Sequence, residues 1–165
     1  MQFYWVSIVT NARSGVVIQN NYVHNADCHN YGAWGLYVDL DCHNVVVQNN
    51  FAHDFYDGRV QFHYGFNNVV KNNILGLNKK GLMSKGENNG EQWWRLNNSI
   101  FITNERNFYC DLSGSNTFNS YSSIYLDFNM GIQWFRDGDG KDNTRTLIDP
   151  KFKDPLKRDF TFSDS

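Results

Sequence analysis

Short apolar runs that end in a pair of asparagines recur along the chain. They read VVIQNNYV from Val16, VVVQNNFA from Val45, VVKNNIL from Val69 and WWRLNNSIF from Trp93. The pairs begin at Asn20, Asn49, Asn72 and Asn97, so successive pairs are 29, 23 and 25 residues apart. A repeat of about 20 to 50 residues is typical of solenoid proteins, in which each repeat forms one coil.

The residue types within each run predict a strand, a corner and a second strand. β-Branched and aromatic residues favour strands, and Asn tolerates the left-handed backbone conformation that a corner needs. Stacked coils lie about 4.8 Å apart, so Asn amides can form a ladder while Val and Ile fill the interior. The pattern therefore predicts an all-β, right-handed parallel β-helix with Asn ladders. The strands at Val16, Val45 and Val69 should pair in parallel, with Asn20, Asn49 and Asn72 stacked at one corner.

Two other solenoids fit the pattern less well. A leucine-rich repeat has a similar period but needs L-x-x-L-x-L spacing, which is absent, and a helical solenoid needs longer runs with a 3.6-residue period. We expect one domain, with coils over residues 1–148 and a C-terminal exit segment over 149–165. The chain opens on FYWVSIV and stops at DFTFSDS without a polar cap, so we expect a fragment that lacks N-terminal coils and self-associates.

Composition and charge exclude several classes of partner. Apolar residues make up 41% of the chain and the net charge is -2, with the basic residues scattered. We therefore expect neither nucleic acid nor an anionic membrane as a partner. No apolar run reaches the roughly 20 residues of a membrane span, and the N-terminus lacks the features of a signal peptide. Three cysteines, Cys28, Cys42 and Cys110, are too few for a disulfide framework.

A segment of alternating polarity, Trp34 to Asp41, is the first place where chemistry is expected. Alternation directs Leu36, Val38 and Leu40 inward, and Tyr37, Asp39 and Asp41 outward. On the next coil, GRVQFHYG buries Val60 and Phe62 and exposes Arg59, Gln61 and His63. A count of 22 residues aligns the three outward residues of the first coil with these three, provided that a one-residue bulge adjusts the 23-residue period.

Such a face is suited to sugar cleavage. Glycosidases use a proton donor and a second carboxylate about 5 to 10 Å apart. Asp39 is the first choice for a catalytic carboxylate, with Asp41 or a residue on a missing coil as its partner. The alternative is that both carboxylates only solvate a β face. The expected sugar-binding residues are Trp34, Tyr37, Arg59, Gln61, His63 and Tyr64.

We expect no metal and no other cofactor. His24 and His53 occupy the same position of the repeat, near Cys28, His29, Cys42 and His43, but the spacing matches no zinc signature. Polar side chains stacked on a solvated turn are the commoner explanation for the two histidines. The acidic loop from Asp137 lacks the Gly and Glu positions of an EF-hand.

Three phrases carry a resemblance to a known family: YGAWGLYVDLDCHNVVVQNN, FHYGFNNVVKNNILG and LIDPKFKDPLKRDF. Together they resemble the C-terminal half of bacterial β-helix proteins related to family 141 glycoside hydrolases, roughly from Val16 to Phe162. The resemblance implies a secreted or periplasmic enzyme that acts on fucose- or xylose-containing polysaccharide with paired acidic residues in a cleft.

The family motifs match only in part. In the family pattern W-G-I-Y-L-D-E-G, Asp39 matches the Asp, while Leu40 and Asp41 replace the Glu and the Gly. In H-Q-H-Y-G, His63 and Tyr64 match and Gln61 replaces the first His. The β-helix repeat also occurs in lyases, esterases, tail spikes and adhesins. Two functions are therefore expected: a glycoside hydrolase, or a non-catalytic carbohydrate-binding or adhesive solenoid.

Overall fold

The chain is built almost entirely from short β-strands. The computed structural model describes residues 14–27, 33–39, 42–56, 58–62, 65–77, 83–85, 94–103, 109–110, 118–121, 124–127, 141–142, 146–147 and 149–163. Within these residues, the only helix is a single 3₁₀ turn near the C-terminus. The expected all-β class is therefore confirmed, and the helical solenoid is wrong.

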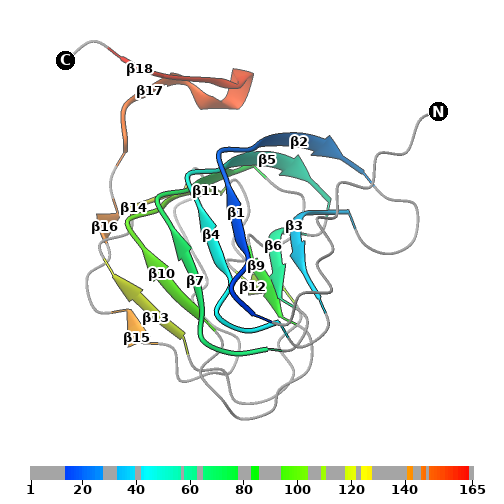
Figure 1. The fold of residues 1–165 in the computed structure, drawn as a ribbon. Helices are drawn as coiled ribbons and strands as arrows, with labels where there is room; N and C mark the ends of the chain where they lie inside the picture. The colour runs from blue at the N-terminus through cyan, green and yellow to red at the C-terminus, as the bar shows by residue number, and fades with distance from the viewer. Residues whose placement is uncertain are drawn as a thin grey trace.

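The strands form three parallel sheets (Figure 1). Sheet 1 contains β1 (Val17–Gln19), β4 (Val46–Gln48), β7 (Asn68–Lys71), β10 (Trp94–Asn97), β13 (Phe118–Tyr121) and β15 (Lys141–Asp142). Sheet 2 contains β2 (Tyr22–Ala26), β5 (Phe51–Phe55), β8 (Ile74–Gly76), β11 (Ile100–Thr103), β14 (Ile124–Asp127) and β16 (Thr146–Leu147). Sheet 3 contains β3 (Trp34–Val38), β6 (Gly58–Phe62), β9 (Met83–Lys85) and β12 (Tyr109–Cys110).

The chain visits the three sheets in rotation, so three successive strands form one coil. The strands β1, β2 and β3 form the first coil, and each pairs in parallel with the strand that follows it in its own sheet, β4, β5 and β6. The same order continues through β7 to β12, and the last two coils add described strands to sheets 1 and 2. A leucine-rich repeat, with one strand per repeat, does not describe this arrangement.

The register of sheet 1 confirms the predicted pairing of the repeated phrase. Val17 pairs with Val46, and Val46 pairs with Val69. The first asparagines of the pairs, Asn20, Asn49 and Asn72, follow directly in this register. Their backbone NH groups donate to the next coil over 3.0 to 3.4 Å. These asparagines therefore stack at one corner, as expected.

The fourth repeat is shifted by one residue from the predicted alignment. Asn97 pairs with Lys71, so Asn98 is the residue that follows Asn72 in the stack, and Ser99 replaces the second asparagine. The Ser99 hydroxyl accepts a hydrogen bond from the NH of Asn73 over 3.2 Å. The phrase WWRLNNSIF predicted that Asn98 would continue the ladder. The hydroxyl oxygen of Ser99 continues it instead.

Left-handed residues turn the chain at the two corners that flank sheet 1. Asn20, Asn49, Asn72 and Asn98 have φ values of 59, 55, 53 and 47°. A second corner, before sheet 1, uses Gly15, Asn44 and Asn67, with φ values of 76, 54 and 53°. Asn and Gly adopt this conformation at the lowest cost among the common residues. Asn therefore serves repeatedly at both corners that flank sheet 1.

The interior is a set of apolar columns that run across the coils. One column contains Ile18, Val47 and Val70, which pair in register and are all buried. A second contains Val23, Ala52 and Leu75 from sheet 2. Sheet 3 adds Leu36, Val38, Val60 and Phe62, all with no exposed surface. Stacking of like residues lets each coil bury its apolar side against its neighbours.

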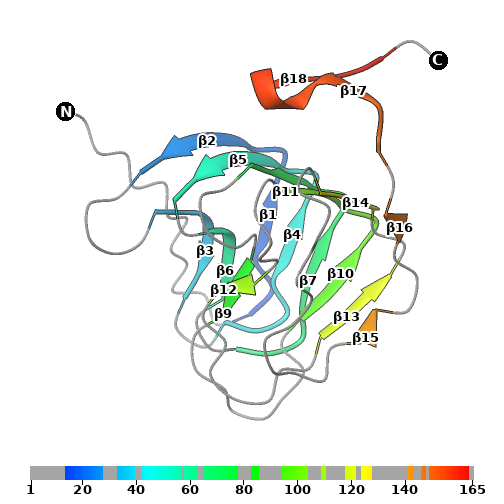
Figure 2. The ribbon, with the colours of Figure 1, turned by 180° about the vertical axis from the view of Figure 1, so that it is seen from behind.

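An antiparallel hairpin lies over the outer face of sheet 2 (Figures 1 and 2). This C-terminal hairpin consists of β17 (Phe152–Asp154), the 3₁₀ helix η1 (Pro155–Lys157) and β18 (Asp159–Phe162). Buried Phe152 packs with Leu77 and Ile102, and Ile74, Ile100 and Phe160 contact this cluster. The outer face of sheet 2 is therefore partly a second apolar core.

Candidate functional site

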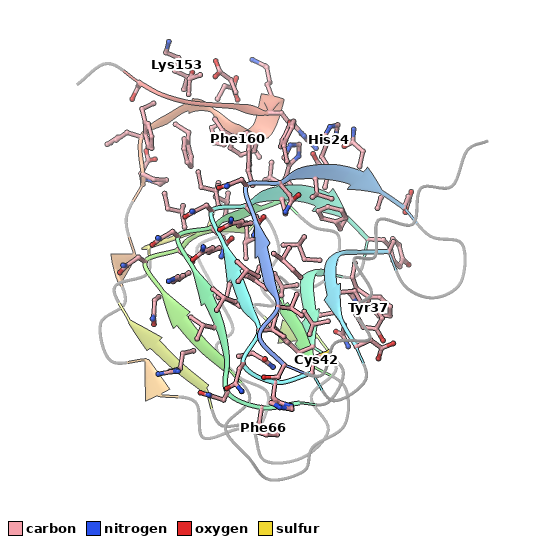
Figure 3. All side chains as sticks on the ribbon, viewed as in Figure 1. His24, Tyr37, Cys42, Phe66, Lys153 and Phe160 are labelled. Atoms are coloured by element: carbon pink, nitrogen blue, oxygen red, sulfur yellow. The ribbon has the colours of Figure 1, made fainter. Side chains whose placement is uncertain are left out.

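The predicted site on β3 has the expected alternation of side chains. Leu36 and Val38 are buried, whereas Tyr37 and Asp39 are partly exposed. The ring of Trp34 stacks on the ring of Tyr37, with centroids 5.0 Å apart and an interplanar angle of 24°. Figure 3 shows Tyr37 directed away from the interior of the stack. The structure thus stacks Trp34 on Tyr37 and leaves Tyr37 and, two residues further along the chain, Asp39 partly exposed.

Close contacts hold the backbone at Asp39 and at Cys42. The Cys42 thiol donates a hydrogen bond to the carbonyl oxygen of Asp39 over 2.7 Å. A Cβ on Gly65 would lie 1.9 Å from the carbonyl oxygen of Cys42, and Gly65 has a φ of +92°. Only glycine fits this position without a backbone shift. Cys42 and Gly65 therefore fix the backbone that carries Asp39.

The predicted alignment between the first two coils in sheet 3 is wrong. Tyr37 pairs with Gln61, which lies two residues beyond the predicted partner, Arg59. Val60 and Phe62 are buried as expected, but Gln61 is only 6% exposed, so its predicted exposure is also wrong. Its side-chain oxygen is buried and accepts no hydrogen bond within the described part of the chain. Gln61 is adjacent to the Tyr37 strand, but its amide is covered.

The remaining predicted residues cannot be placed around this pair. Asp41, His63 and Tyr64 lie outside the described residues, and Arg59 is described only as part of β6. The described part of the predicted site therefore consists of Trp34, Tyr37 and Asp39. Gln61 is buried on the neighbouring strand, paired with Tyr37.

Sequence reasoning missed a second polar cluster, on the outer face of sheet 2. His24 and His53 pair in register and their rings stack, with centroids 5.4 Å apart and an interplanar angle of 12°. Their shared repeat position is confirmed. Their assignment to a solvated turn is wrong, because they lie on β2 and β5 and His53 is only 2% exposed.

His53 is the centre of a chain of hydrogen bonds. Its Nε2 atom lies 2.9 Å from the Tyr22 hydroxyl, and its Nδ1 atom lies 2.7 Å from Asp54 Oδ2. Arg158, on the C-terminal hairpin, donates to both oxygens of Asp54 over 2.8 and 2.5 Å. The sequence signal for this cluster was the repeated histidine, whereas Arg158 is 104 residues away from Asp54 in the chain.

Burial and charge oppose each other within this cluster. Burial lowers the pKa of His53 most strongly; the hydrogen bond and charge of Asp54 raise it, and the result is a pKa below 6.5. Burial raises the pKa of Asp54, but hydrogen bonds from Arg158 and His53 outweigh it and leave the pKa below 3.8. At neutral pH, Asp54 is therefore ionised and His53 is neutral.

Aromatic rings cover the cluster from the hairpin side. Phe160 lies edge-on to Phe51, with centroids 4.6 Å apart, and contacts the His53 ring at 5.2 Å. Figure 3 places Phe160 on the hairpin facing sheet 2, near the β2 strand that carries His24. Tyr22, by contrast, is 60% exposed. The hydrogen-bond chain therefore runs from a partly exposed ion pair, through buried His53, to an exposed tyrosine.

The described residues show neither a cluster of metal ligands nor a membrane-spanning helix. They contain no group of three or more His, Cys, Asp or Glu side chains placed to hold a metal ion. They also contain no helix that is long and apolar enough to cross a membrane. Comparison with known proteins found no matching family model, no matching curated protein and no matching solved structure.

Proposed function

We propose that the chain is part of a right-handed parallel β-helix that binds and hydrolyses polysaccharide on the outer side of sheet 3. The observation that carries this proposal is the Trp34–Tyr37 ring pair beside the partly exposed Asp39. Stacked aromatic rings offer an apolar surface to a sugar ring, and a neighbouring carboxylate can act in acid–base chemistry. Register-paired parallel sheets visited in rotation support the β-helix part of the proposal.

In the proposed enzyme, Asp39 is one of two catalytic carboxylates. Asp41, or an acidic residue on a further coil, supplies the second, and Arg59, Gln61, His63 and Tyr64 contribute to sugar binding. The substrate class, fucose- or xylose-containing polysaccharide, comes from the resemblance to family 141 glycoside hydrolases, as does an extracellular or periplasmic location. The second candidate is a non-catalytic carbohydrate-binding or adhesive solenoid, favoured by the aromatic pair, which binds sugar without a second carboxylate.

Reducing-sugar release from fucosylated and xylan-type polysaccharides tests the proposal. With Asp39 as acid, base or nucleophile, Asp39→Asn should lower the rate by at least about 100-fold, while retention in a polysaccharide affinity gel is preserved. Tyr37→Ala should weaken retention because it removes one ring of the pair.

His24→Ala, on the other outer face, is the matched control and should leave turnover unchanged. Circular dichroism verifies folding of each variant. Full activity of Asp39→Asn would remove the catalytic assignment. Binding without any cleavage would favour the adhesive solenoid, and neither binding nor cleavage would contradict both.

A further inference from the structure

The Tyr22 cluster has the connectivity of a hydroxyl activated by an imidazole and a carboxylate. Asp54 is ionised, so it accepts the Nδ1 proton of His53 over 2.7 Å. This hydrogen bond leaves Nε2 of the neutral ring unprotonated, facing the Tyr22 oxygen at 2.9 Å. Tyr22 must then donate its proton to Nε2, because the imidazole nitrogen has only a lone pair to offer. The acceptor for the phenol proton is already in place.

The surroundings hold this geometry and leave the phenol accessible. His53 is buried, stacked on His24 and in contact with Phe51 and Phe160. Arg158 fixes both oxygens of Asp54, so the carboxylate cannot rotate away from the ring. Tyr22 is 60% exposed although its ring contacts Phe51 at a centroid distance of 5.1 Å. A small molecule from solvent can therefore reach the Tyr22 side chain while the base stays covered.

We infer that Tyr22, His53 and Asp54 form a nucleophilic site that accepts acyl groups from thioesters or aryl esters. This site lies on the outer face of sheet 2 and goes beyond the proposed polysaccharide site on sheet 3. Tyr22 is the nucleophile, His53 the base, and Asp54 a positioning residue that fixes the tautomer and orientation of the ring.

The phenol determines the class of acyl donor. An acyl group moves readily to an oxygen whose conjugate acid is no stronger than that of the leaving group. Tyrosine has a pKa of about 10 and a thiol about 8.5, whereas an alcohol is close to water at about 15.7. Transfer to Tyr22 is therefore favourable from a thioester or an activated aryl ester and unfavourable from an alkyl ester. The acyl-tyrosine can in turn transfer its acyl group to water or to a carbohydrate hydroxyl.

The proposed reaction balances without a further reagent. The Tyr22 oxygen forms a bond to the acyl carbon while its proton passes to Nε2 of His53. The bond from that carbon to sulfur or aryl oxygen breaks, and the leaving group departs with the electron pair and takes the proton from His53. In the second step, the oxygen of a hydroxyl compound attacks the acyl carbon and its proton passes to His53; the bond from that carbon to the Tyr22 oxygen breaks, and His53 returns the proton to the Tyr22 phenolate.

Acetylation by 4-nitrophenyl acetate tests the inference on the intact chain. Release of 4-nitrophenolate should be accompanied by one acetyl group on the peptide that contains Tyr22, as identified by mass spectrometry. Tyr22→Phe should abolish this adduct, and His53→Gln should slow its formation by roughly 100-fold. Tyr56→Phe is the matched control, since Tyr56 lies beyond β5 and outside the cluster, and it should leave the Tyr22 adduct unchanged.

The pH dependence of the acetylation rate distinguishes a Tyr22 hydroxyl that His53 activates from one that only packs against His53. The groups that face Tyr22 and His53 are His24, Asp54 and Arg158. With His53 as base, acetylation of Tyr22 should rise through the lowered pKa of His53 and stay level from about pH 6.5 to 9. An unassisted tyrosine should instead react about tenfold faster for each pH unit until about pH 10.

A continued rise to pH 10, or acetylation at Tyr22 no faster than at other tyrosines, would overturn the inference. So would an adduct on His24 or lysine alone. The acetylation assay contains no polysaccharide. A negative result would therefore contradict the Tyr22 site without bearing on the proposed polysaccharide hydrolysis by Asp39.

Discussion

The two asparagines of each pair have different roles at the corner of a coil. The first, as in Asn49, is exposed and adopts a left-handed backbone. The second, as in Asn50, is only 2% exposed and bonds in both directions along the stack. Its Oδ1 atom accepts from the NH and the side chain of Asn21 over 3.1 and 2.9 Å. Its side-chain nitrogen donates to the carbonyl of Ile18 and to Asn73.

This difference predicts opposite tolerance to substitution at adjacent positions. Asn50→Ala removes the Asn50 side-chain partners of the Asn21 NH and of the buried Ile18 carbonyl, whereas Asn73 Oδ1 keeps the backbone NH of residue 50. It should lower the free energy of unfolding by about 3 kcal/mol, since each such group costs about 1 to 3 kcal/mol. Asn49→Gly keeps access to the left-handed conformation and should change it by less than about 1 kcal/mol. Urea denaturation followed by circular dichroism measures both; equal losses would contradict the division of roles.

The residue pattern indicated the repeat but not this division of roles. Paired letters identify a corner, because Asn tolerates φ values near 55°, as at Asn49. They do not indicate which side chain turns inward, and in the fourth repeat the pair is displaced so that Ser99 takes the buried position. A serine hydroxyl satisfies the same backbone NH, and the sequence alone gave no reason to prefer it over Asn98.

At the level of strands, the lengths of the connecting segments determine the residue offset between paired strands of successive coils. Sheets 1 and 2 keep the 29-residue offset between the first two coils, as in the contact of Asn21 with Asn50. The segment between β2 and β3 is longer than that between β5 and β6, so sheet 3 has a shorter offset. A period counted at the Asn corner therefore could not predict that Tyr37 pairs with Gln61. Inward and outward positions on β3 were predictable, because alternation within a strand is independent of loop length.

The contact between the hairpin and sheet 2 should weaken in acid in two stages. The pKa of His53 is lowered in the folded chain, so protonation below pH 6.5 favours the unfolded chain and removes stability until the folded pKa is passed. The pKa of Asp54 is also lowered, so stability present above pH 3.8 is lost as the pH falls further. Thermal melts from pH 8 to 3 should show both declines.

His53→Gln should flatten the upper decline and leave the lower one, because glutamine does not titrate. His43→Gln is the matched control, because His43 stacks on Phe66 outside this cluster, and it should keep the two-stage profile. A parent protein with constant stability between pH 7 and 5 would contradict the role assigned to His53.

For the molecule as a whole, an ion pair of long sequence separation and a small apolar contact hold the C-terminal hairpin among the described residues. Arg158 bonds to both oxygens of Asp54, and its guanidinium also contacts the carbonyl of Leu156. Arg158→Gln should lower the free energy of unfolding by about 1 kcal/mol, since Arg158 is half-exposed and solvent screens the pair.

The same variant should make the segment from Lys151 to Ser163 more sensitive to trypsin. Lys157→Gln is the matched control, because Lys157 pairs only with Asp154 within the hairpin and is largely exposed. In this control variant, trypsin should cleave the hairpin as slowly as in the parent. Equal cleavage of Arg158→Gln and the parent would show that the apolar contacts of Phe152 and Phe160 suffice.

The long-range ion pair between Arg158 and Asp54 also affects the order in which the coils unfold. Coils that touch only their neighbours lose structure one at a time from an end, and their amides exchange with solvent progressively faster toward that end. Because the hairpin follows the last coil and binds the second, fraying from the C-terminal side must first release it. In the parent, the backbone amides of β5, β8 and β11 should therefore exchange with solvent at similarly slow rates. In Arg158→Gln, the rates should form a gradient that rises toward β14, and the cooperativity of the stack should fall with it.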